Sequence, residues 1–131
     1  MAAKTGGDAA AGAQTLAGSA IAPGIIAPTV VAVSPPEGAQ GVSADTDVTV
    51  TFSKDMSSLT ITPSTFILLE RDANVPVDAG YSYDPTSKRA ILNPDTALKA
   101  GTYYKVNITT GVLDTTGKGL PMSKTWDFKV A

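Results

Sequence analysis

From Thr29 onward, hydrophobic and polar residues alternate in short runs that are separated by Gly, Pro, Asn and Asp. The clearest run is Asp47–Ser53, in which Val48, Val50 and Phe52 alternate with polar residues. A repeat of two residues is typical of a β-strand with one buried and one exposed face. This run therefore predicts a strand whose apolar residues, Phe52 among them, face a core.

Similar runs predict further strands along the same stretch. They are Val31–Val33, Phe66–Glu70, Tyr81–Tyr83, Arg89–Leu92, Thr102–Thr110 and Thr125–Val130, of which Thr102–Thr110 is expected to be the longest. Asp84–Lys88 predicts a hairpin turn, and Pro76 between two valines predicts an edge strand or a wide hairpin. Pro94–Leu98 allows one helical turn at most. Because about seven or eight strands with one apolar face each must cover one another, the pattern predicts an all-β antiparallel sandwich.

Residues 1–28 differ from the rest in being rich in Ala and Gly and in lacking any apolar period. We expect them to form a flexible, disordered tail or linker before a single domain at residues 29–131. A signal peptide is the disfavoured alternative, because Gly7 and Asp8 follow Lys4 closely and no long apolar run appears. No segment is long enough to insert into a membrane.

The composition excludes several kinds of chemistry. The 131 residues contain no Cys and no His, which excludes thiol nucleophiles, disulfides, the usual zinc sites and histidine acid–base catalysis. The net charge of −2, from 10 basic and 12 acidic residues, offers no electrostatic footprint for nucleic acid. A serine nucleophile would need a lysine base, and the Ser–Lys neighbours occur at chance level. We therefore expect no enzymatic activity.

Five pieces of the sequence, taken in order, resemble the bacterial Ig-like domain family of S-layer and other cell-surface proteins. The pieces are Val33–Ser43, Val48–Met56, Ala90–Pro94 with Leu98–Val106, Asp114–Leu120 and Thr125–Phe128. The resemblance covers residues 29–130 and implies an Ig-like sandwich used in tandem as a spacer or adhesive module. It implies no common active site.

Several residues have an expected structural role. The spacing of Leu98, Gly101 and Tyr104 resembles a corner motif in which a tyrosine hydroxyl bonds to backbone a few residues upstream. Trp126 and Phe128 lie on the apolar face of the last predicted strand, so a core role is favoured over ligand stacking.

Three tyrosines are candidates for binding a ligand. Tyr81 and Tyr83 lie on the same face of a predicted strand. If that face points inward, both tyrosines belong to the core, which is the favoured interpretation. If it points outward, the two rings can stack on sugar rings. Tyr103 points opposite to Tyr104 and is the better candidate for an exposed aromatic residue.

The loop from Asp114 to Lys118 is a further ligand-binding candidate. Calcium needs six to eight converging oxygens, and Asp72 and Asn74 match only the first spacing of a calcium loop. Turn chemistry explains Asp114 and Gly117 without a metal. We therefore expect no cofactor, with a calcium site as the disfavoured alternative.

The sequence favours a structural or spacer module of a secreted or cell-surface bacterial protein, supporting surface assembly or adhesion. The expected partners are neighbouring domains of the parent protein, with cell-surface polysaccharide or other surface proteins as further candidates, and the isolated domain is expected to be a monomer. The alternative is a carbohydrate- or ligand-binding accessory module, with or without calcium. A hydrolase is the least favoured function.

Overall fold

The computed structural model describes residues 26–131, so most of the predicted tail lies outside the described residues. The described chain forms eight strands and one short 3₁₀ helix at Ser58–Thr60. The strands are β1 (Val30–Ser34), β2 (Val48–Phe52), β3 (Phe66–Glu70), β4 (Val75–Pro76), β5 (Ala79–Asp84), β6 (Arg89–Pro94), β7 (Tyr103–Ile108) and β8 (Lys124–Lys129). This confirms the predicted all-β fold.

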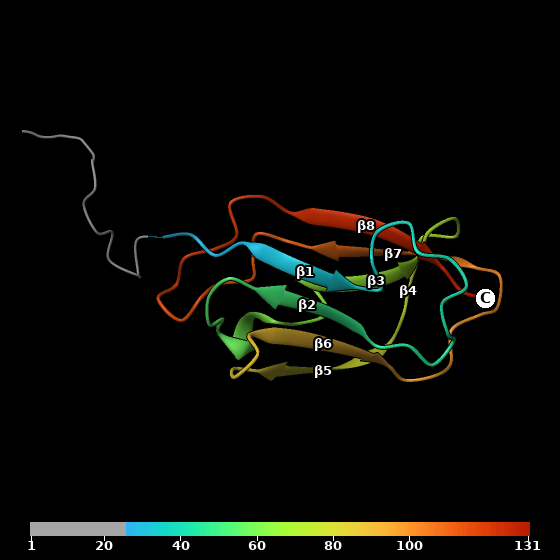
Figure 1. Cartoon of the computed structure of the whole chain (residues 1–131), viewed down its shortest axis with the longest axis horizontal. Helices are drawn as coiled ribbons and strands as arrows, with labels where there is room; N and C mark the ends of the chain where they lie inside the picture. The colour runs from blue at the N-terminus through green and yellow to red at the C-terminus, as the bar shows by residue number, and fades with distance from the viewer. Residues whose placement is uncertain (1–25) are drawn as a thin grey trace, which may run out of the picture.

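The strands form two four-stranded sheets, in the orders β1-β2-β6-β5 and β4-β3-β7-β8. All strand pairs in both sheets are antiparallel. The two sheets lie face to face, and the strands run between two opposite ends of the domain (Figure 1). This is the predicted sandwich, with an Ig-like division of strands between its sheets.

The core lies between the two sheets and contains the residues that alternate with polar ones along each strand. Val48, Val50 and Phe52 of β2 are at most 2% exposed. Trp126 of β8 is also buried, and its indole Nε1–H donates a hydrogen bond of 2.8 Å to the carbonyl of Pro35. Phe128 stacks on Tyr104 with 5.9 Å between ring centroids. Two strands from one sheet and the loop after β1 are thereby tied together.

A tyrosine corner connects the two sheets where the chain passes from β6 to β7. The backbone N–H of Lys99 donates a hydrogen bond of 2.9 Å to the hydroxyl of Tyr104. Gly101 has a φ of 68°, a left-handed conformation that favours glycine. Leu98 is buried beside it, and its N–H donates to the carbonyl of Ala44.

The segment Pro94–Leu98 contains no helical turn, which agrees with the sequence-based limit of one turn at most. Pro94 ends β6, and the N–H of Leu98 bonds to the carbonyl of Ala44. The strand predicted at Thr102–Thr110 is shorter, because the N–H of Thr109 bonds to the carbonyl of Thr65 in a loop. The predicted edge position of Pro76 is confirmed, since β4 is the outer strand of its sheet.

Replacing Tyr104 with Phe is expected to lower the free energy of unfolding by about 1–3 kcal/mol. The variant keeps the ring packed on Phe128 but leaves the N–H of Lys99 without its acceptor. Denaturant unfolding measures the loss. Tyr103→Phe is the matched control, because the described contacts of Tyr103 are made by its ring. Equal losses in both variants would contradict the role of the Tyr104 hydroxyl.

Candidate functional site

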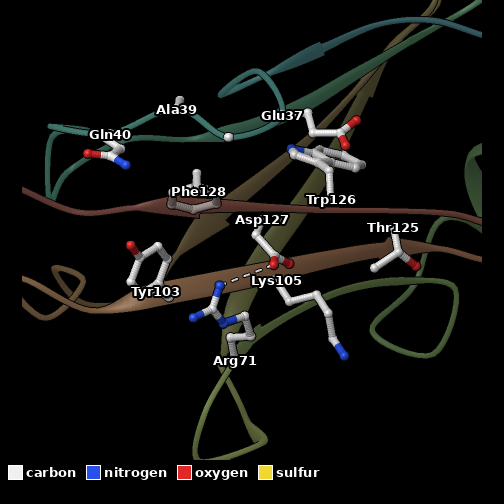
Figure 2. A pocket seen from close by; sticks show the side chains of 11 residues that line it. Glu37, Ala39, Gln40, Arg71, Tyr103, Lys105, Thr125, Trp126, Asp127 and Phe128 are labelled. Carbon is white, nitrogen blue, oxygen red and sulfur yellow. Dashed lines mark hydrogen bonds and ion pairs between the residues drawn. The ribbon is translucent and has the colours of Figure 1, made fainter.

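An open groove of about 470 Å³ lies on the outer face of the second sheet. Arg71, Tyr103, Lys105 and Asp127 line it, and residues 37–40 form its rim. Figure 2 shows the Arg71 guanidinium reaching between Tyr103 and Asp127, while the Lys105 side chain extends away from the rim. The groove contains the one tyrosine that the sequence predicts to be exposed.

Cations flank the Tyr103 ring. The Arg71 guanidinium carbon lies 4.0 Å from the ring centroid, and Lys129 Nζ lies 5.2 Å from it. Arg71 follows β3 and Lys129 ends β8, so the cations come from the two strands that neighbour β7. Such cation–π contacts stabilise the ring where it is. A sugar that stacks on Tyr103 must therefore compete with Arg71.

Two carboxylates hold Arg71 over the ring. Its Nε lies 3.2 Å from Asp72 Oδ1, and its Nη1 lies 3.4 Å from Asp127 Oδ2. The hydrogen bond with Asp72 is the main reason that the pKa of Arg71 is raised above its ordinary value. Asp72 is thus paired with a side chain next to it in the sequence, and Asn74 occupies a left-handed turn position with φ 57°.

Tyr81 and Tyr83 point between the sheets. The Tyr81 hydroxyl donates a hydrogen bond of 2.7 Å to the carbonyl of Phe66, whose ring meets the Tyr81 ring edge-on. The Tyr83 hydroxyl donates to Asp55 Oδ1 at 2.7 Å and accepts from the N–H of Met56 at 2.8 Å. Desolvation raises the pKa of Tyr83 to about 12. The arrangement matches the inward interpretation, and neither hydroxyl is left for a sugar.

Asp114 is buried, with an exposure of 1%. Its Oδ2 accepts from Lys54 Nζ at 2.9 Å. Its Oδ1 accepts from the Thr116 hydroxyl, the Thr116 N–H and the Lys118 N–H at 2.6, 2.8 and 2.9 Å. Both oxygens are therefore used inside the protein. The two oxygens of Asp114 are thus not free for a ligand, and the exposed side chains of the loop are those of Thr115, Thr116 and Lys118.

The Asp114 carboxylate joins three segments that lie far apart in the sequence. Lys54 also donates a hydrogen bond of 2.6 Å to the carbonyl of Ile26, at the start of the described chain. Residues 26–28, which the sequence analysis placed in the tail, thus contact the domain, and Pro28 is buried. Burial raises the pKa of Asp114, but the hydrogen bonds from Lys54, Thr116 and Lys118 outweigh it, so the pKa lies well below its ordinary value.

Sequence reasoning missed Lys54 as the partner of Asp114, because sixty residues separate the two. The only available signal was a lysine two residues after the buried phenylalanine that ends β2. Within residues 26–131, no group of three or more acidic, His or Cys side chains is placed to hold a metal ion. The same part of the chain contains no helix long and apolar enough to cross a membrane.

Comparisons with known proteins agree with this fold. A family model described as "Bacterial Ig-like domain" matches residues 25–130. No curated protein sequence matches the chain significantly.

Among solved structures, the S-layer protein rSbsC(31-844) is 22% identical with a TM-score of 0.58, covering 79% of this chain and 14% of that chain. PcoC, a methionine-rich copper resistance protein from Escherichia coli, is 14% identical with a TM-score of 0.64, covering 81% of this chain and 100% of that chain. The LD transpeptidase LdtMt1, in complex with imipenem, is 16% identical with a TM-score of 0.52, covering 78% of this chain and 40% of that chain. At these identities the likeness shows the fold alone.

Replacing Asp114 with Asn is expected to lower the free energy of unfolding by roughly 3 kcal/mol at neutral pH, because Lys54 loses its buried counter-charge. A carboxyl with a depressed pKa stabilises the fold fully above its unfolded pKa of about 3.9, and the contribution fades as the pH falls below that value. The difference in the free energy of unfolding between wild type and Asp114→Asn should therefore be smaller in acid than at neutral pH. Denaturant unfolding of both proteins at pH 7 and at pH 3 measures this difference. A difference that does not change with pH would contradict the charged state of Asp114.

Proposed function

Because the chain belongs to the bacterial Ig-like domain family, we propose that it is a non-catalytic spacer module of a larger secreted or cell-surface bacterial protein. The observation that supports this most directly is the position of the two ends. The described chain enters at one end of the sandwich, before β1, and leaves at the opposite end, after β8 (Figure 1). A module with this geometry separates its neighbours by at least the length of its strands, about 20 Å for six residues.

The strand arrangement also suits a module that transmits tension. β1 and β8 run along the line between the two ends, and each is hydrogen-bonded to an antiparallel neighbour. Tension between the ends is therefore applied along the strands, so several hydrogen bonds must break together. The expected partners are the neighbouring domains of the parent protein. The S-layer protein, of which this chain covers 14%, contains a domain of this fold within a much longer chain.

Ligand binding in the Tyr103 groove is the second candidate function. The groove offers an aromatic ring with Arg71, Lys105 and Asp127 around it, a set of groups that recognises polar ligands. Binding of a sugar by stacking requires Arg71 to leave the ring together with its contacts to Asp72 and Asp127. That competition makes the spacer function the better supported of the two.

Titration of the chain with cell-wall polysaccharide and with Ca²⁺ is expected to leave the backbone NMR signals of Arg71, Tyr103 and Lys105 unchanged. A saturable shift at these residues, abolished in Tyr103→Ala and retained in Thr51→Ala, would overturn the spacer proposal in favour of binding. Thr51 is a suitable control because it belongs to the other sheet.

Stretching a single chain between handles at residues 26 and 131 is expected to give one cooperative unfolding peak, because unfolding under force depends on the barrier to breaking the native contacts. A gradual extension without a peak would contradict a role in transmitting tension. Asp114→Asn should lower the peak force, since Asp114 joins the chain entry to the body of the domain through Lys54. Lys105→Gln on the outer face is the matched control and should leave the force unchanged.

A further inference from the structure

The charged residues are distributed unevenly between the two ends of the domain. The N-terminal pole is the end where β1 begins, and it comprises residues 26–29, 53–65, 84–89 and 109–124. The C-terminal pole is the opposite end, with residues 43–47, 70–78, 95–102 and 129–131. The antiparallel pairing of the strands places these segments at opposite ends (Figure 1).

The N-terminal pole has a net positive charge. It contains five basic side chains and three acidic ones: Lys54, Lys88, Arg89, Lys118 and Lys124 against Asp55, Asp84 and Asp114. Asp114 is buried against Lys54, so this pair cancels inside the protein. Lys88, Arg89 and Lys118 remain exposed on the surface.

The C-terminal pole has a net negative charge. It contains six acidic side chains and three basic ones: Asp45, Asp47, Glu70, Asp72, Asp78 and Asp95 against Arg71, Lys99 and Lys129. Arg71 is paired with Asp72, and Lys99 is paired with Glu70. Asp45, Asp47, Asp78 and Asp95 are exposed, and none of them joins an ion pair described within residues 26–131.

We propose that the two poles are complementary docking surfaces, so that the acidic C-terminal pole of one copy binds the basic N-terminal pole of the next. This inference rests on the proposed spacer function and adds a direction to it. Complementary potentials favour the head-to-tail contact, whereas contacts between like poles bring charges of one sign together. Such a contact joins two different surfaces, so it extends from copy to copy, as an open chain or, if the rotation between copies closes, as a ring.

The N-terminal pole also exposes apolar side chains that a partner can cover. Leu59 is 88% exposed, Met122 is 78% exposed and Ile26 is 49% exposed. They are three of the five large hydrophobic side chains exposed within residues 26–131. Leu59 and Leu113 line an open groove of about 460 Å³ at this pole. The opposite pole exposes Val75, at 47%. The charges thus give orientation, and the apolar residues give area to bury.

Diluting the full chain from millimolar concentration in low salt tests the contact by NMR, with EDTA present to exclude bridging by calcium. We expect concentration-dependent shifts at both poles, for example at Thr115 and Thr96, and none at Thr49 or Thr51 on a sheet face. The shifts should weaken between about 0.01 and about 0.15 M salt, as the Debye length falls from about 30 to about 8 Å.

Charge exchange then tests the direction of the contact. Lys118→Glu and Asp95→Lys should each weaken association by roughly threefold. An equimolar mixture of the two should recover it, because the intact N-terminal pole of one variant can bind the intact C-terminal pole of the other. Lys105→Glu, which makes the same charge change as Lys118→Glu but on the side of the domain, should have no effect.

Two outcomes would overturn the proposal: shifts that are absent or lie on the sheet faces, and a mixture that associates no better than its components. Both leave the spacer function standing. A polysaccharide-dependent response at Tyr103 would instead remove the spacer function without changing the dilution experiment. The failures of the two proposals are therefore distinguishable.

Discussion

The shared apolar layer between the two sheets is the constraint on which the rest of this structure depends. Each central strand has one apolar and one polar face, so neither sheet is stable in water without the other. β2 and β7 show this most clearly, since every second residue in each of them is buried. The remaining features either extend this layer or close its ends. Trp126 and Tyr104 connect the layer to loops, because Trp126 bonds to Pro35 in the loop after β1 and Tyr104 bonds to Lys99 in the loop before β7.

Closing the ends of the layer requires polar groups to be buried, and the structure uses hydrogen bonds to make this possible. An unpaired buried carboxylate is costly, whereas one with four donors is stable in its charged form. Asp114 satisfies this condition because its own loop supplies three donors and Lys54 supplies the fourth. The charge therefore serves to fix the geometry of the N-terminal pole, and the same carboxylate cannot also serve a ligand.

The sequence was sufficient to predict features that depend on neighbouring residues. Alternation identified the strand at Val48–Phe52, and the spacing from Leu98 to Tyr104 identified the corner. It was insufficient where the deciding partner lies far away in the chain. Tyr103 was correctly placed on the outer face, but the cations beside its ring come from the residue after β3 and from the end of β8. Asp114 was correctly placed in a turn, but its burial depends on Lys54, sixty residues earlier. The position of Leu98 likewise depends on a distant carbonyl, that of Ala44, to which its N–H donates.

The number of neighbours that constrain a side chain differs between the sheet faces and the two ends of the domain. On the faces, a side chain is constrained by the strand on either side of it, and a change of charge disturbs pairs such as Lys105 and Asp127 that lie opposite each other. At the poles, exposed loop residues such as Lys118 and Asp78 have fewer such constraints. Their charges can therefore differ between related domains while the apolar layer remains unchanged. A family that keeps one fold can in this way vary the order and orientation in which its domains meet, because the residues that determine the contact are separate from those that determine the fold.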